Sequence, residues 1–382
     1  MILILFFTTI IASNYAKSEN SARLILTFNN QQGVINAMSK LSDKAIEHFP
    51  LENINGLVVN ANERALALIL DEKDILNIEE DQIVWASPKP DRPPKPDKGD
   101  NTVVQEIDWG VLAIKADNVW NRLSGSGVNV AVIDTGISLT HDDLYVVDGI
   151  NFTRAKSYND DNGHGTHVAG TIAGLDNDIG VKGVAYDANL YAVKVLDRKG
   201  SGYLSDVIAG IDWSIENGMD VINMSLGSNS ESFALEQILI AAEEANIIAI
   251  AASGNDAAEM DFPGAYNETI AVGAIDSIND LAYFSSFGPE LDVVAPGVNI
   301  YSTYKGEDYR ALNGTSMATP HITGLAVLFT ESNRKNGLEV NLNDFRNALS
   351  LGSTDLGSAG YDNYYGYGLP QAQSVIFGEI LE

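Results

Sequence analysis

Three glycine-containing segments carry an aspartate, a histidine and a serine that could together hydrolyse an amide or ester bond. Asp134 lies within VIDTG, His164 opens HGTHVAG, and Ser316 lies within GTSMATP. A serine hydroxyl becomes a nucleophile when a histidine takes its proton, and an aspartate orients that histidine and stabilises its cationic form. The chain order Asp, His, Ser matters because unrelated folds carry the same groups in different orders. These residues are the candidate catalytic groups of a hydrolase.

Each of these residues must be positioned by an element of secondary structure. Asp134 directly follows the apolar run 128–133, which is typical of a strand buried on both faces of a parallel sheet. Ligands of such sheets bind beyond the carboxyl ends of the strands, where Asp134 would lie. For a single aspartate, a turn or helix-capping residue is the alternative.

Helices are predicted to begin at the other two residues. His164 opens a pattern in which Val168 and Ile172 recur at spacings of four. Ser316 begins a longer helix, whose N–H groups could stabilise negative charge on a substrate oxygen, although Gly-Thr-Ser alone could be a capping sequence. Pro320 lacks an N–H and leaves a carbonyl near Ser316 without its helical partner. The histidines beside the motifs are interpreted as structural: His141, His167 and His321.

From residue 104 onward, short apolar runs alternate with helical segments. Such runs occur at 190–195, 221–224 and 247–251, and a helical segment such as 205–217 lies between two of them. Strands connected by helices form parallel sheets with both faces covered. We predict a three-layer α/β/α sandwich with a mostly parallel central sheet over 104–378, without internal repeats.

Taken together, these motifs resemble those of the subtilisin-like serine proteases. The resemblance extends from about Gln105 to Ala372 and includes the stretches 191–196, 220–227 and 284–290. It implies a serine endopeptidase that cleaves peptide and protein substrates through an acyl-enzyme intermediate on the triad serine.

The resemblance also implies residues that hold the oxyanion and the substrate. Asn255, in ASGN, matches a family asparagine whose side-chain amide donates to the oxyanion, and a turn residue is the alternative. Two segments match the family's strands that pair with an extended peptide: Gly200, Ser201 and Gly202, and Ser225, Leu226 and Gly227. Leu204, Val207 and Leu226 would line an apolar pocket several residues before the scissile bond, unless they only pack the core.

Two aspartates lie where the resemblance places the pocket for the residue before the scissile bond. Asp261 aligns near the base of this pocket and Asp256 at its rim, in a loop shorter than in many relatives. Carboxylates there would favour lysine or arginine before the scissile bond, and an ordinary surface aspartate is the alternative.

The segment LDNDIGV at 175–181 matches the family's calcium loop. By this match, a structural Ca²⁺ would bind side-chain oxygens of Gln105, Asp143 and Asn177 and the carbonyl oxygens of Leu175, Ile179 and Val181. Six oxygen ligands suit Ca²⁺. A turn loop without metal is the alternative.

The composition narrows the class of protein. The 382 residues include 52 acidic and 23 basic ones, for a formal net charge of −29. This balance argues against nucleic acids and anionic membranes as partners, since phosphate binding relies on lysine and arginine. A solvated acidic surface is the simplest interpretation, and adaptation to a saline medium is a sharper one. With no cysteine, disulfides, thiol catalysis and cysteine-bound zinc are excluded.

The N-terminal part is predicted to be a precursor segment. Residues 1–16 fit a secretory signal that is too short to span a bilayer, although no basic residue lies close to Met1 and a buried strand is the alternative. Residues 23–87 form an α+β pattern that resembles the inhibitory propeptide of subtilisin-like precursors. The proline-rich stretch 88–103 is a stiff linker, and it could be a plain spacer or the segment cut during maturation. We expect an exported monomer, extracellular or periplasmic, inhibited by its own propeptide.

Other functions remain to be weighed against a general endopeptidase. A processing protease with a single native target fits the same residues. A catalytically inactive peptide-binding relative would lack a triad or oxyanion residue, and none is missing. An esterase is disfavoured because Gly-x-Ser-x-Gly does not surround the serine, and the His-Glu-x-x-His motif of metalloproteases does not occur.

Overall fold

The computed structural model describes residues 22–42, 46–61, 63–69, 73–86 and 104–378. The predicted secretory signal at 1–16 and the predicted linker at 88–103 lie outside these ranges. No helix within the described ranges is long and apolar enough to cross a lipid bilayer.

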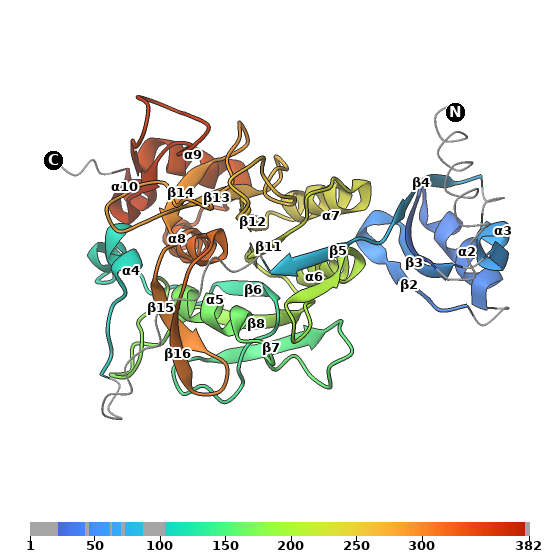
Figure 1. Ribbon diagram of the computed structural model, residues 1–382, viewed down its shortest axis with the longest axis horizontal. Helices are drawn as coiled ribbons and strands as arrows, with labels where there is room; N and C mark the ends of the chain where they lie inside the picture. Colours follow the sequence, from blue (N-terminus) through green and yellow to red (C-terminus); the bar gives the residue numbers. More distant parts are fainter. Residues whose placement is uncertain (1–21, 43–45, 62, 70–72, 87–103, 379–382) are drawn as a thin grey trace.

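A seven-stranded sheet lies at the centre of the larger part of the chain (Figure 1). Every pair of neighbouring strands in it is parallel. In spatial order the strands are β14 (Val293–Pro296), β13 (Ile270–Ile275), β12 (Ile248–Ala252), β10 (Val221–Met224), β6 (Asn129–Asp134), β8 (Asn189–Lys194) and β7 (Val146–Asn151). The apolar runs of the sequence are strands of this sheet, and most of them are apolar throughout because both faces are covered.

Alternate side chains of the central strands enter two separate cores. From β6, Val132 packs into the core on one face and Ile133 into the core on the other. The first core is completed by α5 (His164–Ala173) and α8 (Thr315–Lys335), and the second by α6 (Leu204–Glu216) and α7 (Phe233–Glu244). The predicted three-layer α/β/α sandwich is confirmed.

Shorter elements surround the sandwich. They are α4 (Trp109–Ala113), η2 (Ala116–Val119), β15 (Ile300–Tyr304), β16 (Asp308–Leu312), α9 (Leu342–Gly352), β17 (Ser353–Thr354), β18 (Leu369–Pro370) and α10 (Ala372–Phe377). Of these, the β15–β16 hairpin contacts α5 directly, and so it lies close to the helix that His164 opens.

The N-terminal unit has a sheet and a core of its own. Its four strands pair antiparallel in the order β2-β3-β1-β4, and Leu24, Phe28 and Leu57 lie in its core. Its elements are β1 (Ala22–Phe28), α2 (Gln31–Ser42), β2 (His48–Leu51), η1 (Glu52–Ile54), β3 (Gly56–Ala61), α3 (Glu63–Ile69) and β4 (Ile75–Glu80). The first helix of this unit begins at Gln31.

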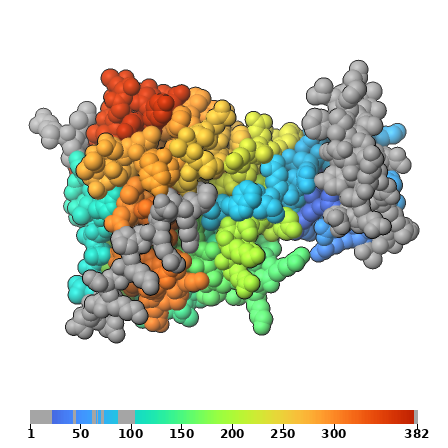
Figure 2. Space-filling view, viewed as in Figure 1, coloured from blue at the N-terminus to red at the C-terminus, as the bar shows by residue number. Residues whose placement is uncertain are grey.

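One further strand connects the two parts. The elements involved are β5 (Ile83–Ala86), β9 (Ser201–Tyr203) and β11 (Leu226–Gly227), and β5 lies between the other two, antiparallel to both. In Figure 1 the arrow of β5 points from the N-terminal unit toward β11. Figure 2 shows light-blue residues of this part of the chain between yellow residues on one side and green residues on the other.

Candidate active site

An aspartate and a histidine meet at the carboxyl end of β6. Nδ1 of His164 lies 2.9 Å from each carboxylate oxygen of Asp134, and both side chains are buried. Asp134 is the last residue of β6 and His164 is the first residue of α5. The close approach needs a glycine, since a Cβ at Gly165 would clash with the carbonyl oxygen of Gly136.

This geometry determines which nitrogen of the imidazole can act as a base. An ionised carboxylate only accepts hydrogen bonds, so the Asp134 pair favours the tautomer with the proton on Nδ1 of His164. Nε2 of His164 is buried and has no hydrogen-bond partner among the described residues. Its lone pair is therefore available to a hydroxyl proton.

Ser316 lies in the first turn of α8, and its hydroxyl is bonded to a neighbouring loop. Oγ of Ser316 donates to the carbonyl oxygen of Ser225 at 3.0 Å, and Oγ of Ser225 donates back to the carbonyl oxygen of Ser316 at 3.0 Å. Pro320 cannot provide the helical N–H for that carbonyl. The carbonyl that the sequence left without a partner is thus satisfied by a side chain, which fixes the backbone of Ser316.

Two hydrogen-bond donors converge beside Ser316. A Cβ built on Gly314 would lie 3.6 Å from both Nδ2 of Asn255 and the backbone N of Ser316. The amide of Asn255 is oriented by Thr315, whose backbone N–H and hydroxyl both donate to Oδ1 of Asn255, at 2.9 and 3.0 Å. Nδ2 is therefore directed away from Thr315, as a donor for an oxyanion requires.

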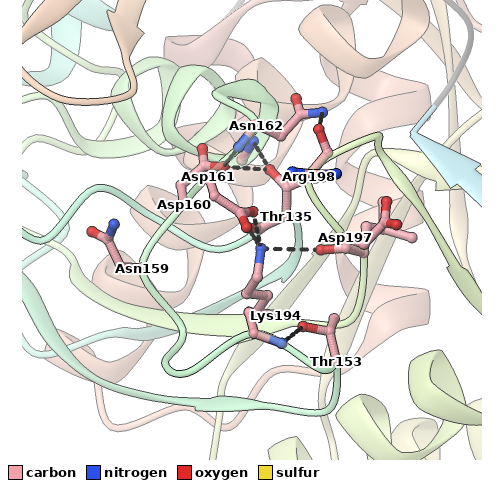
Figure 3. Close-up of polar contacts among 12 residues, drawn as sticks. Thr135, Thr153, Asn159, Asp160, Asp161, Asn162, Lys194, Asp197 and Arg198 are labelled. Carbon is pink, nitrogen blue, oxygen red and sulfur yellow. Dashed lines mark hydrogen bonds and ion pairs between the residues drawn. The ribbon is translucent and has the colours of Figure 1, made fainter.

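A fully buried lysine, missed in the sequence, links the loops on either side of the Asp–His pair. Nζ of Lys194 donates to the carbonyl oxygen of Thr135, to Oδ1 of Asp161 at 2.8 Å and to the carbonyl oxygen of Leu196 at 3.2 Å. Figure 3 shows its ammonium group pointing toward Thr135 and the loop that carries Asp160 and Asp161. The sequence does contain a sign of this group, since a lysine stands inside the apolar run 190–195. A buried ammonium needs a charged partner, so this lysine indicates an ion pair inside the protein.

Asp160 holds the same loop from within. One of its carboxylate oxygens accepts from the hydroxyl of Thr135 at 3.0 Å and from the backbone N–H of Gly163 at 2.8 Å. The other accepts from the backbone N–H and hydroxyl of Thr166, at 3.0 and 2.6 Å. Asp160 thereby joins the turn after Asp134 to the first turn of α5.

The segments predicted to bind a peptide are already paired with β5. Trp85 lies opposite both Ser201 and Gly227, and the backbone N–H of Ala86 donates to the carbonyl oxygen of Gly200 at 2.9 Å. Val84 lies opposite Gly202. Side chains of β5 also enter the predicted apolar pocket, where Val84 belongs to one buried cluster with Leu204, Val207 and Leu226.

A sequence model of the subtilase family matches residues 125–368 of this chain. The chain belongs to the subtilase family. It is similar to an alkaline protease of Alkalihalobacillus alcalophilus, with 49% identity over 277 residues that cover 72% of this chain and 70% of the relative. Subtilisin Savinase of Lederbergia lenta is 49% identical over 274 residues, 71% of this chain and 98% of the relative. Subtilisin NAT of Bacillus subtilis subsp. natto is 39% identical over 386 aligned positions, 98% of this chain and 95% of the relative.

Membership of this family makes the chain a serine endopeptidase, and its substrates are peptides and proteins. The inactive peptide-binding alternative is not favoured.

Close to the histidine of this subtilase lies a cavity of about 610 Å³. Its wall includes His164, Ala86 at the end of β5, Gly227 and Asp261. Asp261 is 7% exposed, and burial, with a smaller contribution from the Asp256 carboxylate, raises its pKa to about 6.

The predicted calcium ligands come together in the subtilase structure from distant parts of the sequence. Nε2 of Gln105 lies 2.5 Å from the carbonyl oxygen of Leu175 and 3.3 Å from that of Ile179. Oδ2 of Asp143 accepts from the backbone N–H of Val181 at 2.8 Å, while Oδ1 is buried without a partner in the described part of the chain. Burial raises the pKa of Asp143 to about 6. One buried carboxylate surrounded by carbonyl oxygens is a donor set suited to a hard cation.

Asn177 is the predicted ligand that differs most from expectation. Its Oδ1 accepts from the backbone N–H of Ile179 at 3.2 Å, and its Nδ2 donates to the carbonyl oxygen of Asp142 at 3.2 Å. Both ends of this amide thus have protein partners. Within the described ranges, no group of three or more His, Asp and Glu side chains could hold a metal ion.

The histidines interpreted as structural are held by backbone carbonyl groups. Nε2 of His167 lies 2.9 Å from the carbonyl oxygen of Ile300, and Nδ1 of His321 lies 2.9 Å from that of Met317. Burial lowers the pKa of His167 to about 3 and that of His321 to about 4. Both rings are therefore neutral at physiological pH and serve as hydrogen-bonding core residues.

Proposed function

We propose that this chain is the exported precursor of an endopeptidase in which Ser316 is the nucleophile and His164 the general base. The observation that supports it best is the pairing of both Asp134 oxygens with Nδ1 of His164, next to an Nε2 that has no partner in the described structure. Such a pair has one basic nitrogen available and one carboxylate to stabilise the imidazolium.

The proposed reaction uses these groups in the following way. The hydroxyl of Ser316 leaves the carbonyl of Ser225, transfers its proton to Nε2 of His164 and attacks the peptide carbonyl carbon. Nδ2 of Asn255 and the backbone N–H of Ser316 stabilise the negative charge that develops on the carbonyl oxygen. His164 next protonates the leaving nitrogen, and water hydrolyses the acyl-enzyme by the same proton transfers in reverse.

The N-terminal unit acts in this proposal as an intramolecular inhibitor. Its strand β5 occupies the edges of β9 and β11, which an extended substrate would otherwise pair with. Inhibition by strand pairing is compatible with an Asp134–His164 pair that is already formed in the precursor.

Carboxylates of the N-terminal unit hold this strand in place by capping two helices of the larger part. Asp81 accepts from the backbone N–H and hydroxyl of Ser205 in α6, at 2.8 and 2.6 Å. Glu79 accepts from the backbone N–H groups of Phe233 and Ala234 in α7, at 3.1 and 2.9 Å. Anionic groups are favourable at helix N-termini, where the first N–H groups lack partners.

Two further contacts strengthen this interface. The guanidinium of Arg23 forms ion pairs of 2.7 Å with both Asp81 and Asp206. In the opposite direction, Asp212 of α6 accepts from the backbone N–H groups of Glu52 and Asn53, at 2.9 and 3.0 Å. Acceptors and donors from both parts thus take part in the contact between them.

A structural calcium ion is the second part of the proposal. Gln105, Asp143 and the carbonyl oxygens of Leu175, Ile179 and Val181 would hold it, with Asn177 as the weakest of the predicted ligands. A bound cation would supply a positive charge for the buried Oδ1 of Asp143 and would tie the start of the mature chain to the 175–181 loop.

Export follows from the N-terminal sequence. The apolar stretch 1–16 fits a secretory signal, and a propeptide that keeps the protease inactive suits release outside the cell. We propose an extracellular, monomeric enzyme, with the periplasm as the alternative destination. A dedicated processing role with one target remains compatible with the same site.

The test compares the wild-type precursor with Ser316→Ala and with Ser277→Ala, an exposed serine far along the sequence from the motifs. Wild type and Ser277→Ala should lose mass during maturation and then hydrolyse casein, while Ser316→Ala should do neither. If wild type is neither processed nor active, the proposal is wrong.

A further inference from the structure

The cavity beside His164 lies where a peptide held in the manner of β5 would present its next residue. Ala86 is the last residue of β5 and forms part of the cavity wall together with His164. A substrate that replaces β5 between β9 and β11 would continue past Ala86 toward the catalytic base. The side chain nearest the scissile bond would then enter this cavity.

The inner part of the cavity is shaped to expose one carboxylate. A Cβ added at Gly227 would lie 2.9 Å from Cβ of Asp261, and one added at Gly254 would lie 2.7 Å from Oδ2 of Asp261. Both residues that pack against Asp261 here are glycines, so neither has a side chain that could cover the carboxylate. Of the two, Gly227 lines the cavity together with Asp261, and a long, narrow side chain that enters the cavity there could reach the carboxylate.

Asp261 has no ion-pair or hydrogen-bond partner for its carboxylate among the described residues, although only 7% of its surface is exposed. An unpaired buried carboxylate is costly, and proteins normally pair such a group or bind a cation there. The other charged groups on the wall are Asp256 and Lys199. Both are exposed and solvated, and Asp256 adds a second negative charge.

We propose that Asp261 makes this subtilase prefer lysine or arginine immediately before the scissile bond. The cationic end of that side chain pairs with the Asp261 carboxylate, and its methylene groups lie along the backbone of Gly227. This specificity rests on the proposed function, since it names the substrate class of the same active site.

A pH dependence supports the same assignment and has a defined sign. Burial and Asp256 raise the pKa of Asp261 to about 6. Above this pH the carboxylate is ionised and can pair with a cation, and below it the group is neutral. The preference for basic residues should therefore weaken as the pH falls through about 6, which a purely steric pocket would not show.

The first experiment measures kcat/KM of the matured enzyme for two chromogenic peptides that differ only in arginine or phenylalanine before the scissile bond. Wild type at about pH 8 should favour arginine at least about tenfold. Asp261→Asn should lower kcat/KM for arginine by about tenfold or more and leave the phenylalanine peptide nearly unchanged. Glu259→Gln, an exposed acid in the same loop, should match wild type.

A second measurement does not depend on catalysis. Matured wild type, from which β5 has been removed, should bind benzamidine, an aromatic amidinium, more tightly in calorimetry than matured Asp261→Asn. Equal binding, or a wild-type preference for phenylalanine that Asp261→Asn does not change, would overturn this specificity. Casein hydrolysis distinguishes a failure of this specificity from a failure of the proposed function. An enzyme that cleaves casein but does not prefer arginine would contradict the specificity and leave the proposed function in place.

Discussion

Lys194→Met replaces the buried ammonium near the Asp134–His164 pair with an uncharged side chain of similar length. The Lys194 side chain is fully buried, and it donates to two backbone carbonyl groups and to the carboxylate of Asp161. Because one of these carbonyls belongs to Thr135, directly after Asp134, the substitution should loosen the turn that carries Asp134.

The loss of stability caused by Lys194→Met can be worked out from the burial of the groups that lose a hydrogen-bond partner. Each carbonyl left without its donor costs about 1–3 kcal/mol. The Asp161 side chain is 45% exposed, so water can replace its lost partner and that ion pair contributes about 1 kcal/mol or less. The methionine side chain introduced by the substitution would be apolar and packed, which offsets part of the loss. We expect a net destabilisation of about 3 kcal/mol, or roughly 6–12 °C in Tm for a domain of this size.

The assay is thermal unfolding in the Ser316→Ala background, which removes self-digestion from the measurement. Lys156→Met is the matched control, since Lys156 is exposed in a nearby loop. In otherwise wild-type protein, Lys194→Met should also lower kcat more than it raises KM, because it disturbs the proposed catalytic pair of Asp134 and His164 rather than β9 and β11. A Tm within about 1 °C of the Lys156→Met control would refute the reasoning.

Four other outcomes are expected. Asn255→Ala should lower kcat by about 10²–10³ with little change in KM, measured with a soluble peptide substrate. A change confined to KM would show that Asn255 does not stabilise the oxyanion. Asp81→Asn should weaken inhibition in the full-length precursor about tenfold, seen as faster appearance of casein hydrolysis, because hydrogen bonds to a charged group contribute about 1.5–3 kcal/mol. A calcium chelator should lower Tm by roughly 5–10 °C in wild type and have little effect in Asp143→Asn. If Asp261 selects basic residues, maturation in the 88–103 stretch should leave Gly99 as the N-terminus, since of the basic residues there only Lys98 is not followed by proline; another N-terminus found by sequencing would contradict this.

The fold and the reactive groups were accessible from sequence because their signals are local. The run 128–133 is apolar because β6 is covered on both faces, and this alone indicates a buried strand of a parallel sheet. His164 and Ser316 stand at helix starts, where spacing and glycines mark the boundary. Pro320 even revealed that a carbonyl near Ser316 would lack its helical donor.

The partners of these buried polar groups are residues from distant parts of the chain. Ser225 supplies the donor for the carbonyl of Ser316, and Asp161 the charge for Lys194. Spacing along the chain carries no information about such pairs, since the partners are far apart in sequence and meet only through the packing of separate elements.

The sequence by itself therefore determined the sheet, the helices and the types of residue that do the chemistry. The tertiary structure decided which side chains are buried, which partners they have and which strands are already paired. It placed β5 between β9 and β11, capped α6 and α7 with carboxylates of the N-terminal unit, and buried Asp261 without a partner among the described residues. The physical reason is that desolvation and pairing energies depend on three-dimensional neighbours, whereas hydrophobic period and turn chemistry depend on neighbours along the chain.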